Sequence, residues 1–269
     1  MYDIGAVEAE LAGTIYSGRL HFSAVTGSTN TDAMAAARSG APRGSVFFAD
    51  EQTAGRGRGD HNWQSAAGAG LYVSVLLRPQ LPAPFLPLLP FAAGLAAADA
   101  IRAAAGLTID LRWPNDLLVG PRKTGGILVE AQTQAQPDAA AVSFAVVGIG
   151  INVHQRSFDP ALATPATSLD IESGQRISRQ VLLVSLLKSL ERETTGLIDP
   201  RLRETIHARV ERASTWVRGR RVEVHGPQAF TGTTEGLDEH GFLQVRTDAG
   251  LVQVQTGGIR DGQPLAPSL

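Results

Sequence analysis

The pattern of apolar and polar positions divides the chain into a long part with alternating strands and helices and a shorter part of strands alone. In the long part, apolar runs bounded by turn residues predict strands at 44–52, 70–79, 109–116, 125–133 and 142–153. The segment QAQPDAAA, at 134–141, has the composition of a turn between the last two strands. Prolines recur through 79–90, which favours a loop or the approach to a helix, because proline cannot hold a place in a central β-ladder.

The residues that favour helix ends mark out four helices. The spacing of apolar positions predicts helices at 28–40, 91–106, 178–197 and 199–214. Thr29 or Asn30 is the expected N-cap of the first helix, and Gly40 is its expected end. The fourth helix begins with Asp199 as cap and Pro200 at the first helical position, an arrangement that proline tolerates well.

The character of the chain changes near Trp216. Short alternating segments joined by Gly- and Asp-containing turns follow at 219–226, 229–238, 241–248 and 250–257. Four or five such strands without a helix predict a small β-barrel. We therefore expect a larger domain over residues 1–216 and a smaller one over residues 217–269.

Composition excludes several functional classes. The 269 residues include 24 Lys and Arg against 26 Asp and Glu, so the formal net charge is −2, which argues against bulk non-specific binding to nucleic acid. The chain has no cysteine, and therefore no disulfide, thiolate metal site or cysteine nucleophile. We see no signal peptide and no apolar run of the ~18 to 20 residues that span a membrane, and we expect a cytoplasmic protein without a membrane partner.

The most unusual local sequence is TAGRGRGDHNWQS at residues 53–65. Arg56 and Arg58 alternate there with glycines, and Trp63 follows. A glycine-rich backbone is loose until something orders it, and guanidinium groups are planar, bidentate donors suited to carboxylates and phosphates. The segment lacks the Gly-Lys-Ser/Thr ending of a P-loop. An anion clamp that closes on its ligand, a nucleic-acid contact and a solvated surface loop are the alternatives that the residues leave open.

Three further motifs place polar groups at predicted strand ends. In RWPNDL, proline fixes the backbone and Asn115 and Asp116 follow at a strand end, where open sheets usually bind ligands. In RKTGGILVE, Lys123 precedes a Gly-Gly pair that permits close approach of a ligand to the backbone. In GIGINV, an apolar strand ends on Asn152. Taken singly, RWPNDL favours an ordinary Pro-Asn-Asp turn, and RKTGGILVE is equally compatible with a hairpin turn carrying a solvated lysine.

Taken together and in this order, the motifs resemble the catalytic core of the biotin protein ligases. The resemblance runs through Ser28-Thr29-Asn30, Gln52 before GRGRG, Trp63, GLYVS with Tyr72, RWPND, RKTGGILVE and GIGIN. It is dense over residues 20–155, and the small closing barrel extends it to the C-terminus. The fold that it implies is of the α+β class: a mixed β-sheet catalytic domain flanked by helices, similar to class II synthetases, with an SH3-like C-terminal barrel.

The resemblance implies a two-step ligase. Biotin and ATP give biotinyl-5'-AMP and pyrophosphate, and a lysine on the biotin carboxyl carrier domain of an acyl-CoA carboxylase then takes the biotinyl group. The implied catalytic residues are Lys123 and Arg56. The implied contacts with biotin are Ser28, Thr29, Asn30, Gln52, Gly55, Arg56, Gly57, Arg58, Tyr72, Lys123 and Gly126. The implied contacts with ATP are Arg58, Trp63, Asn115, Asp116, Lys123 and Asn152. No metal ion is expected to be tightly bound by the protein, and Mg²⁺ is expected to accompany ATP near Asp116.

The sequence departs from the family pattern in two places. Asp60-His61-Asn62 stand where many relatives have Gly-Arg before the tryptophan, and Arg112 replaces a common lysine, which keeps the charge but changes its geometry. The Ser-Thr-Asn motif begins at Ser28, which leaves no room for the N-terminal winged helix-turn-helix of bifunctional relatives. We therefore expect a ligase that does not repress transcription and has no DNA partner.

Two competing functions remain to be distinguished. A lipoate or octanoate ligase or transferase shares the fold but lacks WPND together with KTGGILVE in this form. An RNA-binding module using GRGRG would bind RNA with steep salt dependence and would not turn over ATP. For the assembly state, a monomer and a weak homodimer are both open.

Overall fold

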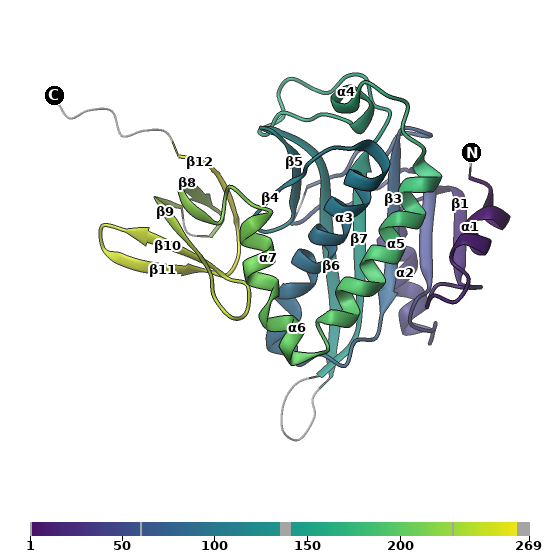
Figure 1. Ribbon diagram of the computed structural model, residues 1–269, viewed down its shortest axis with the longest axis horizontal. Helices are drawn as coiled ribbons and strands as arrows, with labels where there is room; N and C mark the ends of the chain where they lie inside the picture. Colours follow the sequence, from purple (N-terminus) through teal and green to yellow (C-terminus); the bar gives the residue numbers. More distant parts are fainter. Residues whose placement is uncertain (1, 60, 135–140, 228, 263–269) are drawn as a thin grey trace.

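The computed structural model describes residues 2–59, 61–134, 141–227 and 229–262 (Figure 1). Its larger sheet has seven strands in the order β1-β2-β3-β7-β6-β5-β4. Their bounds are β1 Leu20–Thr26, β2 Val46–Gln52, β3 Gly70–Leu77, β4 Asp110–Arg112, β5 Asp116–Val119, β6 Arg122–Gln134 and β7 Ala141–Asn152. The β1–β2 pair is parallel and the other neighbours are antiparallel, so the sheet is mixed, as predicted.

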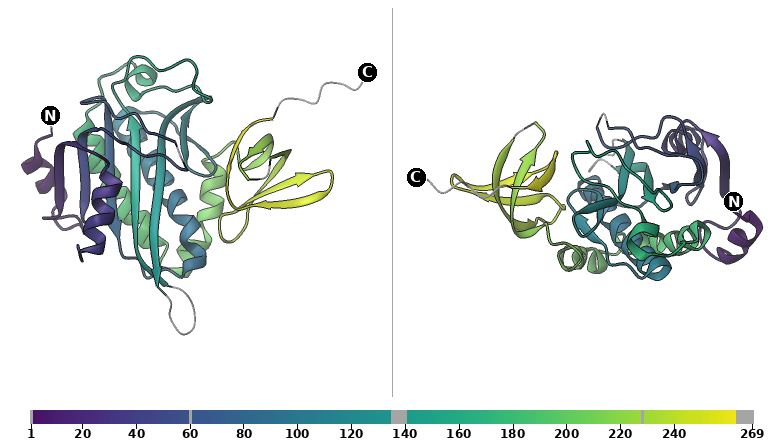
Figure 2. Two further views of the ribbon diagram at one scale, coloured as in Figure 1. Left: turned by 180° about the vertical axis from the view of Figure 1, so that it is seen from behind. Right: turned by 90° about the horizontal axis from the view of Figure 1, so that it is seen from above.

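Helices cover both faces of this sheet (Figure 2). The bounds are α1 Ile4–Glu10, α2 Thr29–Arg38, the 3₁₀ helix η1 Ala83–Leu88, α3 Leu89–Ala105, α4 Leu169–Ser173, α5 Arg179–Gly196, α6 Pro200–Glu204 and α7 Ile206–Arg212. The main apolar core includes the buried sides of α3 and α5. A smaller cluster joins α2 to the opposite face of the sheet and contains Ala33, Ala37, Leu76, Phe144 and Val146.

The alanine-rich helix α3 is the centre of the main core. Its residues from Phe91 to Ala97 are all buried, because small side chains let the helix approach both the sheet and α5 closely. The continuous run Ala83–Ala105 is long and apolar enough to cross a membrane, yet 61% of its most apolar window is buried within the protein. That degree of burial is what the core helix of a globular domain shows.

A second, antiparallel sheet follows α7, with strand order β11-β10-β9-β8-β12. The bounds are β8 Arg218–His225, β9 Phe230–Leu237, β10 Leu243–Thr247, β11 Gly250–Val254 and β12 Gly258–Asp261. These strands match the predicted small C-terminal β-domain. Gly241 seats this sheet against the large domain: Trp113 Nε1 donates to its carbonyl at 3.3 Å, and a Cβ at Gly241 would lie 2.8 Å from the ring of Phe91.

Some sequence-based expectations differ from the structure. The N-cap of α2 is Ser28, one residue earlier than expected, and its C-cap is Ser39. The predicted helix at 199–214 is two short helices that meet at Thr205, although Asp199 does cap the first by accepting a hydrogen bond from Arg201 N. The strand β1, whose exposure alternates irregularly, was not predicted. The turn predicted at 134–141 lies mostly outside the described residues.

Candidate functional site

Three glycines on neighbouring strands form the floor of the candidate site. Gly126 of β6 pairs with Gly150 of β7, and Leu128 of β6 pairs with Gly148 of β7. Because residues two apart in a strand share a face, all three glycines face the α2 side of the sheet. A Cβ at Gly148 would lie 2.0 Å from Asn30 Oδ1, and one at Gly150 would lie 2.5 Å from Trp63 Nε1. The missing side chains therefore leave the space that Asn30 and Trp63 occupy.

The predicted catalytic lysine lies beside this floor. The Nζ atom of Lys123 is 2.5 Å from Asp116 Oδ1 and 5.6 Å from the centre of the Trp63 ring, a cation–π arrangement. A Cβ at Gly126 would lie 3.6 Å from the same amine. The backbone of Lys123 also pairs with the 165–167 segment, donating to Pro165 O and accepting from Thr167 N. The structure thus brings together Lys123, Asp116, Trp63 and Gly126, four of the residues predicted for the site.

Asp116 lies between two cations. Burial alone would raise the pKa of this carboxyl, but Lys123 and Arg112 together outweigh it and hold the pKa below its usual range. Arg112 donates to Oδ2 from two nitrogens, at 3.1 Å and 2.5 Å, while Lys123 occupies Oδ1. Both carboxylate oxygens therefore already accept from cations, and this arrangement does not fit a magnesium ligand. In the described part of the chain, no group of three or more His, Asp or Glu side chains could hold a metal ion.

The glycine-arginine segment is a compact hairpin that folds back over the sheet. Trp63 N donates to Gly55 O at 2.9 Å, and Gly57 N donates to His61 O at 2.7 Å. A Cβ at Gly55 would lie 2.4 Å from Trp63 O, so only glycine allows this close approach of backbone. The same glycines that predicted a flexible backbone therefore also allow the two sides of the hairpin to approach each other closely.

The two arginines of this hairpin reach in different directions. Arg56 forms an ion pair with Glu130 of β6. Arg58 donates to the carbonyl of Gly257, between β11 and β12 of the C-terminal sheet. Burial lowers the pKa of Arg58, opposed by the charge of Asp116, and the guanidinium stays protonated at neutral pH. The hairpin is therefore attached at one point to the large sheet and at another to the small one.

A chain of hydrogen bonds ties the N-terminus of α2 to the base of the hairpin. Thr29 N donates to Gln52 Oε1 at 2.9 Å, and Gln52 Nε2 donates to Ser65 Oγ at 2.7 Å. Thr29 Oγ1 is 2.8 Å from Ser74 Oγ, which donates to Asn30 Oδ1 at 2.6 Å. These amides and hydroxyls are buried or half-buried, and their hydrogen bonds satisfy one another.

The remaining predicted residues are placed as follows. Tyr72 is buried, and its hydroxyl donates to Ala66 O at 3.1 Å; burial is the main cause that raises its pKa above the usual value. Asn115 donates to Ile127 O at 2.7 Å, which ties the turn before β5 to β6. Asn152 donates to Thr167 O at 3.0 Å, which ties the end of β7 to the 165–168 segment. Ser28 is buried and caps α2 without a capping hydrogen bond among the described residues.

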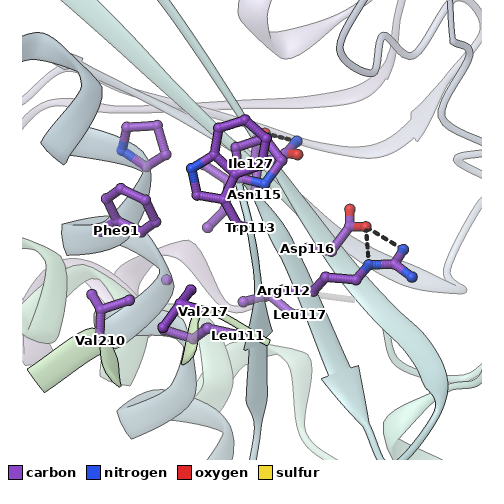
Figure 3. Close-up of a pocket in the computed structure, with 13 residues that line it drawn as sticks. Phe91, Leu111, Arg112, Trp113, Asn115, Asp116, Leu117, Ile127, Val210 and Val217 are labelled. Carbon is purple, nitrogen blue, oxygen red and sulfur yellow. Dashed lines mark hydrogen bonds and ion pairs between the residues drawn. The ribbon is translucent and has the colours of Figure 1, made fainter. Parts of the chain in front are cut away.

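A narrow apolar crevice lies behind the Trp113-Pro114 turn, whose peptide bond is cis (Figure 3). Its accessible volume is about 10 Å³, close to what one water molecule needs. Phe91, Ile127 and Val210 contribute to its walls, with the Arg112–Asp116 pair at its edge. The crevice is therefore a gap in the packing between the turn and α3, too small for a cofactor.

Sequence reasoning missed three side chains of the site: Ser65, Ser74 and Glu130. Ser74 is a single polar residue inside an otherwise apolar strand, and nothing in its spacing marks it as part of a site. For Glu130, a signal existed. Strand alternation in β6 puts Gly126, Leu128 and Glu130 on one face, so a carboxylate four residues after the Gly-Gly pair points to the side of the candidate site.

Comparison with known proteins identifies relatives for both parts of the chain. Residues 22–152 match the profile of the Biotin/lipoate A/B protein ligase family, and residues 218–259 match the Biotin protein ligase C terminal domain. The chain is 35% identical over 245 residues to the Bifunctional ligase/repressor BirA of Bacillus spizizenii, covering 88% of this chain and 72% of that protein. It is also 35% identical over 245 residues to the Biotin--[acetyl-CoA-carboxylase] ligase of Mycobacterium tuberculosis, covering 88% of this chain and 86% of that one.

A solved structure has the same arrangement of elements. The biotin protein ligase from Aquifex aeolicus in complex with biotin and ATP aligns with a TM-score of 0.74 at 27% identity, covering 90% of this chain and 98% of that one. The agreement extends over both sheets, since the alignment covers nearly the whole of each chain.

Proposed function

Because this chain belongs to the biotin protein ligase family, we propose that it activates biotin with ATP and transfers it to a lysine of a biotin carboxyl carrier domain. The observation that carries the proposal is the meeting of Lys123, Trp63 and the Arg56 hairpin over the glycine floor of β6 and β7. A ligand can approach the backbone closely at Gly126, and the cations suit a carboxylate beside a phosphate.

In the first step, a carboxylate oxygen of biotin attacks the α-phosphorus of ATP. An acyl–phosphate bond forms, the bond to pyrophosphate breaks, and pyrophosphate leaves with its electrons. Two anions must approach each other, so the protein contributes mainly positioning and positive charge. Lys123 is the group that neutralises charge between the carboxylate and the α-phosphate. Asp116, whose pKa is held low by its two cationic neighbours, holds the lysine amine in place through their contact.

In the second step, the neutral ε-amine of the acceptor lysine attacks the acyl carbon of biotinyl-AMP. The amide bond forms, AMP leaves as the phosphate anion, and the amine loses its proton to solvent. Between the steps the mixed anhydride must be kept from water, which the hairpin of residues 53–65 does by covering the site. Ser28, Thr29, Asn30 and Gln52 shape the biotin end of the site, and Trp63 contacts the adenine.

Several finer features belong to the same proposal. Mg²⁺ accompanies the phosphates of ATP, without Asp116 as a ligand in the described arrangement. The catalytic domain spans residues 1–216 and the C-terminal domain residues 217–269. The protein acts in the cytoplasm as a monomer or weak homodimer, and the net charge of −2 supports the absence of DNA among its partners.

The transfer reaction tests the proposal directly. The protein is mixed with ATP, Mg²⁺ and biotin, and then with an isolated biotin carboxyl carrier domain, and the carrier's mass is followed. We expect one biotinyl addition per carrier and none on a carrier whose acceptor lysine is changed to arginine. Formation of biotinyl-AMP without carrier modification would contradict the second half of the proposal, and absence of both products would contradict all of it.

A further inference from the structure

We propose that Glu130 is a positioning residue, which fixes Arg56 and Asn30 in the geometry that holds the acyl-adenylate. The inference rests on the proposed function and assigns a role to a side chain to which neither the sequence motifs nor the comparisons give one. Glu130 lies on the site face of β6, four residues beyond Gly126. It touches two predicted site residues from two different elements, the hairpin and α2.

Both contacts use the same carboxylate oxygen. Oε2 of Glu130 accepts from Arg56 Nη2 and, at 2.9 Å, from Asn30 Nδ2. A carboxylate can only accept, so the amide nitrogen of Asn30 must face Glu130, and its oxygen must face Ser74. The orientation of the Asn30 amide therefore depends on Glu130. Asn30 is in turn linked through Ser74 and Thr29 to Gln52 at the start of the hairpin, so Glu130 influences that connection as well.

The hairpin holds the backbone on both sides of Arg56, through Gly55 O and Gly57 N, and Glu130 holds the Arg56 side chain. The Arg56 side chain is 42% exposed, whereas that of Glu130 is 27% exposed and projects from the middle of a long strand. Glu130 is thus the more buried member of the pair, and Arg56 is the more exposed member that it anchors.

Anchoring one nitrogen directs the others. The guanidinium group is planar and carries five N–H donors in a fixed fork, so the ion pair at Nη2 sets the direction of the donors on Nε and Nη1. The ion pair also lowers the entropy that Arg56 would lose on closing over an anion, which is the usual gain from preorganisation. We infer that Glu130 slows the escape of biotinyl-AMP without touching the reacting atoms.

A double-mutant cycle separates this role from a general structural one. Glu130→Gln keeps the size of the side chain and removes the charge, and Arg56→Ala removes the anchored group. The readout is the dissociation rate of biotinyl-AMP from the loaded protein, with thermal unfolding measured on each variant. Because the pair is partly exposed, we expect Glu130→Gln to accelerate dissociation about five- to ten-fold in the wild-type background. In the Arg56→Ala background, the same substitution should change the rate by less than about two-fold.

Two further variants complete the design. Glu130→Asp keeps the carboxylate on a side chain one methylene shorter and should restore part of the retention of biotinyl-AMP. It replaces Glu130→Gln in the cycle if Glu130→Gln does not fold. Glu235→Gln breaks an exposed ion pair with Arg246 on the C-terminal sheet, where both contacts are 2.9 Å, and should leave retention unchanged.

The outcomes distinguish the two proposals. Equal effects of Glu130→Gln in both backgrounds, or slower dissociation, would overturn the role of Glu130 while the wild-type reaction upholds the function. A wild-type protein that forms no biotinyl-AMP would overturn both.

Discussion

Replacing Lys123 with alanine removes the cation that the account places between biotin and the α-phosphate. The structure allows the effect on folding to be separated from the effect on chemistry. Lys123 Nζ is 2.5 Å from Asp116, but Arg112 also donates twice to that carboxylate, so the buried charge keeps a partner in the variant. Loss of one charged hydrogen bond costs about 1–3 kcal/mol of unfolding free energy, against the ~5–15 kcal/mol of a typical domain. The variant should therefore fold.

The effect on adenylation should be much larger. A preorganised group aimed at developing charge contributes about 100- to 1000-fold to the rate, because a water-excluded site strengthens its interaction with the transition state. We expect Lys123→Ala to lower the rate of biotin-dependent pyrophosphate–ATP exchange by at least that factor. The matched control is Lys188→Ala, which removes a surface lysine paired with Glu10 at 3.2 Å on the outside of α5. The control should retain full exchange.

The assay is exchange of labelled pyrophosphate into ATP at saturating biotin, with circular dichroism and thermal unfolding measured on the same samples. A folded Lys123→Ala variant whose exchange stays within a few-fold of wild type would refute the catalytic role given to Lys123. An unfolded variant would refute the structural part of the reasoning, namely that Arg112 alone can satisfy the Asp116 carboxylate.

Three further predictions follow from the site. Gly148→Ala places a Cβ 2.0 Å from Asn30 Oδ1, so it should lower the unfolding free energy by about 1–3 kcal/mol and weaken biotin binding. Urea unfolding measures the first effect and calorimetry the second. The control is Gly196→Ala, whose new Cβ meets nothing closer than 3.9 Å. Arg56→Ala should raise the biotin requirement and release biotinyl-AMP, and unchanged retention of the intermediate would count against the hairpin as a clamp. Because the pKa of Asp116 is lowered on folding, its ionised form stabilises the protein above the unfolded pKa of about 4, and this contribution is lost as pH falls through the folded pKa. Asp116→Asn should therefore be less stable than wild type at neutral pH, and the difference should shrink in acid unfolding; a pH-independent difference would contradict the assignment.

The sequence predicted the parts of the fold in which local chemistry and burial agree. The strands around Val73 and Val147 are mainly apolar and buried, and α3 is closed by Gly106, which adopts the left-handed conformation that favours glycine. The strand β1 was missed because it lies at the sheet edge, where Phe22 and Val25 remain exposed and burial imposes no clear alternation. Such edge strands depend on pairing with distant residues, which spacing cannot reveal.

The sequence allowed the candidate site to be located at a set of strand ends, but it did not reveal the hydrogen bonds and ion pairs that connect the site residues. Lys123 and Asp116 come from motifs that flank a turn, and their meeting follows from strand pairing. The ion pair between Arg56 and Glu130 joins residues 74 positions apart, across strands that are not sequence neighbours. Only the register of β6 places that carboxylate under the hairpin, and register is a property of the folded sheet.

The measurement that tests the central claim most directly is pyrophosphate–ATP exchange with the wild-type protein, run separately with biotin, lipoate, octanoate and no acid. We expect exchange with biotin alone, since the first step is adenylation of that carboxylate. Exchange with lipoate or octanoate in place of biotin would keep the fold and move the enzyme to the lipoate branch of the family. No exchange with any acid would contradict the claim that this site forms an acyl-adenylate.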